Sequence, residues 1–580
     1  MKKHLLPALL LVAAVALLYA QTGGFSFLRL DDHDYTFRCA FVKDGLSWAN
    51  AAEAFANPRH AAIWMPVTYL SYMADITFFG PGMGPHHLVN AALHALNALL
   101  LYALLLALLP ARRVDDAPRP TALWAAFLAA LFWALHPQRV EAVAWIAGRK
   151  ELLCALFTLL GLLCWLRPGR LGAAGAVACC ALACMSKPTA MSFPFLAFAV
   201  ARLAPAAPRR TWRLYLPLLV LAAATGALAV YSQTHPEGRP ALALFSASLP
   251  WRLLNAAVST GLYLFQSLVP SGLHLDYRAT PGQFPLDGVR GLATLAAAAA
   301  LCAACAARRP ARRRTLAALL LFFCAALAPT LGVFGSFGEA ARADRFFYLP
   351  ALALSFALFF ALAAPRPASG VRRVAPAALL ALLVAADLCA AFPLVASYRD
   401  DATAFARTLA CDPDNGRALA HVAGDACARG RIDRGISLYR RSQALRPRDD
   451  TAAQLAYALA LRGLSSDFAE IRRLCAKFAC DHALDRKGMA LEALGTTAMR
   501  ERKWAEAIAC LEASVRAPLR FYSADDARLR LGACYANAGR TAEAIRVFEP
   551  LTQSRRVDIA PRARQFLEAV RRHPQTVLFF

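Results

Sequence analysis

Two adjacent carboxylates, Asp31 and Asp32 in the string LRLDDHDYTF, are the residues of this chain best suited to chemistry. They follow closely on the first apolar segment that is long enough to cross a membrane. Neighbouring carboxylates just outside a bilayer can abstract a proton or bind a metal ion. The alternative is a solvated loop that caps the next segment, because Asp is common in loops.

Other ionisable residues lie equally close to apolar segments. The string HPQRVEAVAWIAGRKELL (136–153) and the later strings SKPT and ADRFFYLP contain eight candidate site residues of this kind: His136, Arg139, Glu141, Arg149, Lys150, Lys187, Asp344 and Arg345. Ionisable groups this near a bilayer are costly unless they are paired or used in function. We expect Glu141 to pair with Arg149 or Lys150. A purely structural network of ion pairs that holds the outer loops is the alternative, and for Arg345 the alternative is an arginine that snorkels at the membrane interface.

Three histidines, His86, His87 and His94, form the pattern HHxxxxxxH. The pattern could indicate a metal site, but no carboxylate stands beside it in the sequence, so packing and polar pairing are favoured. No CxxC or Cys/His spacing indicates zinc. The sequence therefore predicts no metal ligands, and it leaves a need for a divalent ion open.

The composition indicates a membrane protein built from helices. The chain has 580 residues, 58% of them hydrophobic and 18% charged, with a net charge of +26. Long apolar runs recur, and each could cross a hydrocarbon core about 30 Å thick. The predicted spans, about eleven in number, are 5–21, 88–110, 120–137, 151–166, 171–186, 189–203, 214–231, 289–307, 315–335, 346–364 and 375–394. The first is interpreted as an uncleaved span rather than a signal peptide.

The positive charge falls in short loops between these runs, at 112–119, 167–170, 202–213, 308–314 and 366–373. This is the positive-inside pattern, so membrane lipid is an expected partner and nucleic acid is not. Lys2 and Lys3 place the N-terminus in the cytoplasm. The segment 251–270 is then re-entrant or interfacial on the outer side. Alternation puts the loop 22–87, the HPQRVEAVAW turn and the C-terminal region on one extracytoplasmic face.

The C-terminal region, 397–575, has the composition of a soluble helical repeat domain, whereas 1–396 forms the membrane domain. LGTTAMRERKWAEAIACLE (494–512) resembles LGACYANAGRTAEAIRVFE (531–549), with small residues where two helices must pack closely. Residues 417–450 fit the same helix-turn-helix unit, with Gly430 in the turn, Tyr439 in the second helix and Pro447 at the exit. This spacing is typical of tetratricopeptide repeats, of which we expect about four, with a degenerate unit at 451–484. The predicted fold class is all-α.

These motifs, taken in order, resemble the transmembrane and tetratricopeptide-repeat O-mannosyltransferases and their bacterial relatives, which are multi-pass C-type glycosyltransferases. The resemblance runs from the Asp31-Asp32 pair through IWMPVTYLSYMADITFFG (63–80) and HHLVNAALHALNALL (86–100) to the HPQRVEAVAWIAGRKELL run, which is its most specific part. SKPTAMSFP (186–194), ADRFFYLP (343–350) and the repeats follow. Leu30 departs from the pattern, since bacterial relatives often have Trp there.

The resemblance implies an inverting transfer of a hexose, mannose by family, from a polyprenyl phosphate carrier to a hydroxyl acceptor such as a protein serine or threonine. It makes Asp31 the general base and Asp32 its orienting partner. Arg345, Lys187, Arg149 and Lys150 would bind the donor phosphate, and His136, Arg139, Glu141 and Asp344 would shape the site. No cofactor is implied. The repeats would recruit a protein or glycan acceptor outside a bacterial plasma (inner) membrane.

Two other classes of protein are weighed against this interpretation. A non-catalytic scaffold anchored in the membrane would need none of the polar motifs. A lipid-linked glycan ligase or flippase is the second rival, and a transporter should show broken Gly/Pro helices and midplane charges in related halves. No such internal repeat is visible in the sequence.

Overall fold

The computed structural model describes residues 2–109, 120–208, 210–236, 248–277, 285–333, 342–363, 371–479, 484–517, 524–554, 556, 558–573 and 578. Within these ranges the chain is helical, with turns and short 3-10 segments and no strand, so the all-α prediction is confirmed. The chain divides into two compact units, one ending at Arg407 and one beginning at Thr408.

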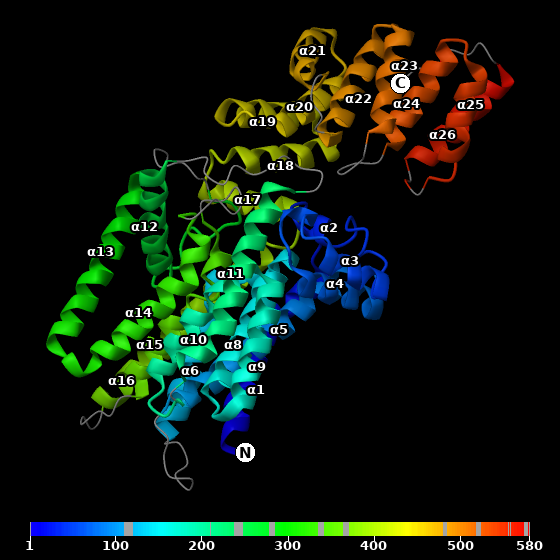
Figure 1. Ribbon diagram of the computed structural model, residues 1–580. Coiled ribbons are helices and arrows are strands. Elements are labelled where there is room, and N and C mark those ends of the chain that lie inside the picture. The colour runs from blue at the N-terminus through cyan, green and yellow to red at the C-terminus, as the bar shows by residue number, and fades with distance from the viewer. Residues whose placement is uncertain are drawn as a thin grey trace. The chain divides into compact units, whose positions relative to one another are not determined.

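The first unit is a bundle of long helices (Figure 1). Seven of its helices contain stretches long and apolar enough to cross a membrane: α1 (Lys2–Tyr19), α5 (Met83–Ala107), α9 (Gly169–Ser186), α11 (Trp212–Thr234), α13 (Pro285–Arg308), α14 (Arg313–Leu327) and α16 (Val371–Ala396). Three shorter apolar helices are α6 (Pro120–Leu135), α10 (Phe193–Leu203) and α15 (Leu352–Ala363). A further helix, α8 (Arg149–Leu166), lies at the predicted span 151–166 and begins with charged residues.

Within the described ranges each of the eleven predicted spans coincides with a helix, and seven of these helices have the length and composition of a crossing, so the count of eleven stays a prediction. The segment 251–270 forms most of a further helix, α12 (Leu249–Gln266). Its interfacial placement also stays a prediction. The predicted arginine cluster at 112–119 and Arg366 lie outside the described residues.

The loop between α1 and α5 carries the carboxylate pair and has structure of its own. Asp31 precedes a single helical turn, α2 (Asp32–Tyr35), and α3 (Trp48–Ala56) and α4 (Pro66–Phe79) follow. Ser47 caps α3 by accepting a hydrogen bond from the Asn50 N–H, and Pro66 at the first position starts α4. Figure 1 shows these elements beside the bundle.

Helices α12 and α13 cross with their backbones in close contact at two glycines. A Cβ added to Gly261 would lie 1.8 Å from the carbonyl oxygen of Gly291, and one added to Gly291 would lie 2.6 Å from that of Val258. Small residues allow such an approach, which is a common way to pack helices in membranes.

We expect Gly261→Ala to force α12 and α13 apart and to destabilise the unit by about 1–3 kcal/mol, the usual cost of overpacking. The matched control is Gly288→Ala in α13, where an added Cβ meets nothing within 4 Å. Thermal unfolding in detergent should separate the two variants. Equal stability of both would contradict the close crossing.

The second unit consists of helical hairpins, as the repeat pattern predicts. The four pairs are α18 (Gly416–Ala428) with α19 (Ile432–Leu445), α20 (Asp449–Arg462) with α21 (Phe468–Cys475), α22 (Leu484–Arg500) with α23 (Trp504–Arg516), and α24 (Asp525–Asn537) with α25 (Thr541–Leu551). A final helix, α26 (Ile559–Arg572), follows. The expected degenerate unit is the second pair, whose α21 is only eight residues long.

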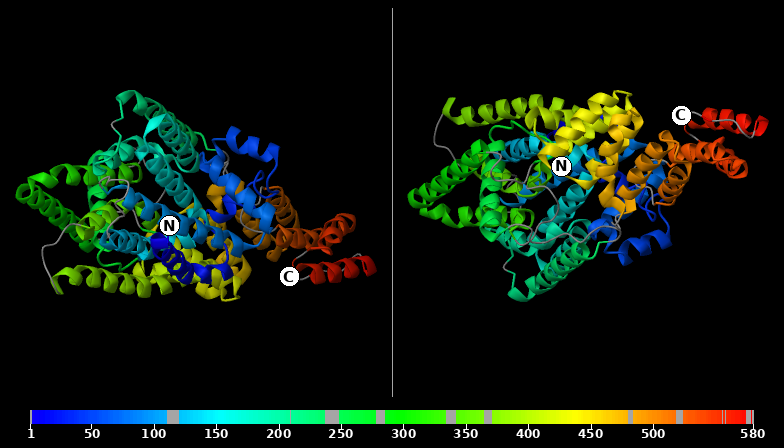
Figure 2. Two further views of the ribbon diagram at one scale, coloured as in Figure 1. Left: turned by 90° about the horizontal axis from the view of Figure 1, so that it is seen from below. Right: turned by 90° about the horizontal axis from the view of Figure 1, so that it is seen from above.

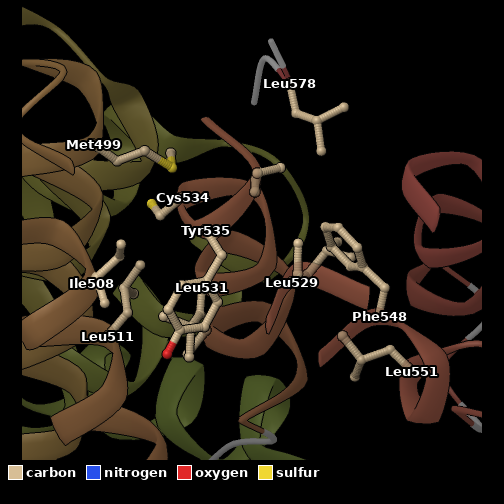
Figure 3. Close-up of a cluster of buried hydrophobic side chains, with 14 of the residues drawn as sticks. Met499, Ile508, Leu511, Leu529, Leu531, Cys534, Tyr535, Phe548, Leu551 and Leu578 are labelled. Carbon is tan, nitrogen blue, oxygen red and sulfur yellow. The ribbon is translucent and has the colours of Figure 1, made fainter. Parts of the chain in front are cut away.

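Glycine explains both the turns and the close packing of these hairpins. Gly430 and Gly539 occupy turns with φ of 76°, a conformation that other residues adopt only with strain. Gly532 lies against Phe548, since a Cβ there would be 2.5 Å from the ring. Figure 3 shows the surrounding core, which includes Leu529 and Leu551.

Candidate functional site

Asp32 is fully buried and both of its carboxylate oxygens are occupied. Oδ2 accepts a hydrogen bond from the Leu28 N–H at 2.9 Å, and Oδ1 accepts one from the Ala147 N–H at 2.8 Å. Burial raises the pKa of Asp32 to about 7, although these two N–H groups oppose the shift. The carboxylate joins the first loop to the segment before α8, so an acceptor hydroxyl has no route to it.

We expect Asp32→Asn to destabilise the first loop by about 1–3 kcal/mol, because the amide nitrogen would face a backbone N–H and leave it unsatisfied. Limited proteolysis between Leu28 and Tyr35 should become faster, and the unfolding temperature should fall. A variant as resistant as the wild type would show that the two backbone bonds contribute little.

Asp31 differs from its neighbour because its side chain is partly exposed, at 40%. The Tyr35 hydroxyl donates to Oδ2 at 3.4 Å, and the Lys150 ammonium lies 3.8 Å from the same oxygen. An exposed carboxylate beside a fixed cation can meet a ligand from solution. Asp31 is therefore the member of the pair whose carboxylate is open to solvent, as the role of a general base requires.

Three cations gather around two aromatic rings next to Asp31. Lys150 Nζ lies 5.5 Å from the Trp145 ring centroid, and Arg345 Cζ lies 4.9 Å from the same ring. Arg345 Cζ also lies 4.8 Å from the Phe346 ring, with Lys187 Nζ at 5.1 Å. The predicted phosphate-binding residues Lys150, Lys187 and Arg345 are thus brought together. Such a cluster of cations suits an anion, and Arg offers phosphate a bidentate fork.

Buried carboxylates hold two of these cations in place. Glu141 accepts hydrogen bonds from the Arg345 guanidinium and, at 2.8 Å, from the Arg345 backbone N–H. Glu151 pairs with Lys187. Burial alone would lower the pKa of Arg345, but the Glu141 carboxylate raises it above its ordinary value, so the guanidinium stays charged. The expected pairing of Glu141 with Arg149 or Lys150 is wrong, because the partner comes from a distant loop.

Arg149 is separate from this cluster and is fully buried. Its guanidinium donates to Asp75 at 2.5 Å, to the Asn90 side chain at 2.7 Å and to the His86 carbonyl at 2.6 Å. The Asn90 amide donates in turn to the Trp145 carbonyl at 3.0 Å. This network fixes the segment that carries Trp145 and Lys150. Its burial and its partners favour a structural role for Arg149, and its predicted contact with the donor phosphate stays a prediction.

The residues predicted to shape the site lie behind it. Arg139 is buried and donates to the Phe347 carbonyl at 2.6 Å, and His136 Nε2 lies 3.2 Å from the Ser267 carbonyl. The Tyr277 hydroxyl donates one hydrogen bond that the two carboxylate oxygens of Asp344 share, at 2.8 and 3.0 Å. Burial, together with the Glu141 carboxylate, raises the pKa of Asp344 to about 7. These contacts position the turn that presents Arg345.

The three histidines of the HHxxxxxxH pattern have polar partners. His87 Nδ1 lies 2.8 Å from the Ala144 carbonyl, and His94 Nδ1 lies 2.7 Å from the Tyr348 hydroxyl. His86 Nδ1 lies 2.8 Å from Asp75. Among the residues that the structure describes, no three His, Cys, Asp or Glu side chains are grouped so that they could hold a metal ion.

Sequence reasoning missed Asp75, Trp145 and Phe346. Asp75 stands alone in the apolar run IWMPVTYLSYMADITFFG, and an isolated acid in such a run signals a buried partner. Nothing in the sequence distinguishes Trp145 and Phe346 from other aromatics near a membrane. Their contact with the cations follows only from the structure, in which Lys150, Lys187 and Arg345 lie around the two rings.

No family model matches the chain. Two curated proteins match a segment of 117 residues, which is 19% of this chain and 15% of each relative. The human one is 36% identical and the mouse one 35%. Both are the protein O-mannosyl-transferase TMTC4. The chain therefore shares a short segment with the predicted family.

Among solved structures, the crystal structure of yeast Tom70 aligns over 77% of this chain and 92% of that chain, at 15% identity. Its TM-score is 0.19, which carries no argument about the fold. The evidence for helical repeats is therefore the set of helical hairpins in the second unit of this chain.

Proposed function

We propose that the protein is a membrane glycosyltransferase that moves a hexose, mannose by resemblance, from a polyprenyl phosphate carrier to a hydroxyl acceptor such as a protein serine or threonine. One observation carries the proposal. The exposed carboxylate of Asp31 lies 3.8 Å from Lys150, which shares the Trp145 ring with Arg345. A partly exposed carboxylate and a cluster of cations thus stand side by side, which supports the roles of base and phosphate-binding group. The short match to TMTC4 supports the same class of reaction.

In this proposal the donor phosphate binds Arg345, Lys150 and Lys187, with the sugar directed toward Asp31. Asp31 takes the proton of the acceptor hydroxyl while that oxygen forms a bond to the anomeric carbon. The bond from that carbon to the phosphate oxygen breaks, and the polyprenyl phosphate leaves with both bonding electrons. Attack from the side opposite the phosphate inverts the anomeric centre. The cations stabilise the charge that develops on the leaving group.

The proposal assigns acceptor recruitment to the helical repeats and places them, with Asp31, on the outer face of a bacterial plasma membrane. The arginine pattern supports this orientation. An alkaline phosphatase fused after Phe580 should then be enzymatically active in a bacterial host, since that enzyme needs an extracytoplasmic environment to form its disulfides. An inactive phosphatase, with a fluorescent cytoplasmic reporter at the same position, would contradict the orientation.

The test of the proposed activity is a panel of radiolabelled polyprenyl phosphate sugars, offered to the purified protein with a hydroxyl-rich protein acceptor. We expect label to move from a polyprenyl phosphate hexose to the acceptor. Nucleotide sugars serve as the contrast. Transfer from a nucleotide sugar and from none of the lipid-linked donors would contradict the assignment of the donor class.

A further inference from the structure

Large apolar side chains are exposed on the first loop of the membrane unit. Trp48, the first residue of α3, is 93% exposed, and Phe78 near the end of α4 is 73% exposed. Leu46, Phe79 and Met83 are exposed as well. We call these five residues the apolar shelf. Single exposed apolar residues are ordinary in proteins, but a group of this size usually has a partner.

The apolar shelf is one surface because the segment before α3 is hydrogen-bonded to the end of α4. The Leu46 N–H donates to the Thr77 hydroxyl at 2.7 Å, and a Cβ added to Gly45 would lie 2.5 Å from that hydroxyl oxygen. The chain that leads into Trp48 is therefore seated on the end of α4, next to Phe78. Only a short Gly-Pro-Gly link separates α4 from the start of α5.

The shelf continues onto a helix that is expected to face lipid. Leu88 and Leu96 on α5 are exposed, and both lie in the candidate membrane span Met83–Ala107. Figure 1 and Figure 2 show α3 and α4 projecting sideways from the bundle, beyond its outline when it is seen along the long helices. Because those helices cross the bilayer, a sideways projection at the start of α5 overlies lipid.

We propose that the apolar shelf inserts into the outer boundary between lipid headgroups and acyl chains. Trp is enriched at that depth, because its ring is apolar and its N–H can reach water or headgroups. A short amphipathic helix can lie in the same plane with its apolar face in the lipid. The inference depends on the membrane spans and on the exposed side chains, and it stands whether or not the proposed transferase activity is correct.

The shelf also bears on the candidate site. His60, between α3 and α4, lies 3.3 Å from the Asp34 carbonyl, in the turn that follows Asp31. Its ring also packs against Phe41 and Tyr69. Lipid contact at Trp48 and Phe78 therefore sets the depth of the Asp31 turn relative to the bilayer surface, where a lipid-linked ligand would present its phosphate.

Fluorescence quenching in proteoliposomes tests the insertion without any need for activity. The emission of Trp48 is isolated as the difference between the wild type and Trp48→Phe, a conservative change at an exposed position. We expect this difference emission to lose most of its intensity in vesicles that contain brominated phosphatidylcholine, and to resist iodide in the aqueous phase. The matched control is Trp504 of α23 in the repeat unit, isolated by Trp504→Phe, which bromolipid should leave unquenched.

A second reporter, Phe78→Trp in the Trp48→Phe background, moves the fluorophore to α4 and should give the same result. Quenching of both positions by iodide and not by bromolipid would overturn the proposal, because the shelf would then face water. Protection of both positions from both quenchers would overturn it as well, because another protein or a second copy of the chain would then cover the shelf.

Discussion

Replacing Asp31 with Asn is expected to lower the rate of sugar transfer by roughly 10²–10⁴-fold, the contribution usually made by a positioned general base. The amide keeps the shape of the side chain and can still meet the Tyr35 hydroxyl, but it cannot take a proton from the acceptor. Because Asp31 is partly exposed and, among the described residues, bonds to no backbone group of another segment, the variant should fold normally. Initial rates at saturating donor, with a thermal unfolding curve, measure both effects.

The matched control is Asp34→Asn. Asp34 lies in α2, the short helix that Asp31 precedes, and its carboxylate faces Arg38 at 3.8 Å rather than the cationic cluster. It should keep a rate close to that of the wild type. Wild-type turnover by a folded Asp31→Asn protein would remove Asp31 from the role of base, and an equal loss in both variants would show that the loop tolerates no change.

Removal of the Arg345 side chain should raise the KM for the lipid donor by roughly 10- to 150-fold, since a charge-assisted hydrogen bond contributes about 1.5–3 kcal/mol. A direct comparison of Arg345→Ala with the wild type mixes two effects. Glu141 is buried and would lose its ion-pair partner, and breaking a buried pair in this way commonly costs about 3–5 kcal/mol of stability.

The design that separates these effects uses Glu141→Gln as the reference and compares it with Glu141→Gln combined with Arg345→Ala. Both proteins lack the buried charge, and they differ only in the guanidinium that could meet phosphate. The double variant should show the higher KM for the donor. An unchanged KM would mean that Arg345 only anchors its turn against Glu141, in which case Lys150 and Lys187 would be the remaining candidates for binding phosphate.

The fold was largely predictable because each element carries a local signal. Apolar runs bounded by arginines predict the helices of the membrane unit, and small residues at fixed spacing predict the hairpins. Gly430 and Gly532 illustrate the second case, since their places in the turn and at the helix contact follow from the repeat pattern alone. The number of membrane crossings is harder to predict, because α8 begins with charged residues and α15 is short.

The sequence could not show which of two adjacent residues faces the site and which is buried behind it. Asp31 and Asp32 are adjacent and chemically identical, yet one is exposed and the other accepts two backbone bonds from separate segments. Arg149 and Lys150 are also adjacent, and the first helical turn of α8 directs one to Asp75 and the other to Asp31. Which of two neighbours faces the site depends on tertiary packing, and no spacing rule encodes it.

The most direct test of the proposed function is the fate of both halves of the donor. Purified protein in proteoliposomes would be given a polyprenyl phosphate hexose labelled in the sugar and in the phosphate, together with a protein acceptor. We expect labelled sugar on the acceptor hydroxyl with its anomeric configuration inverted and an equal amount of released polyprenyl phosphate, and both products should form roughly 10²–10⁴-fold more slowly with Asp31→Asn. Retention of configuration, or equal product from wild type and Asp31→Asn, would contradict the account.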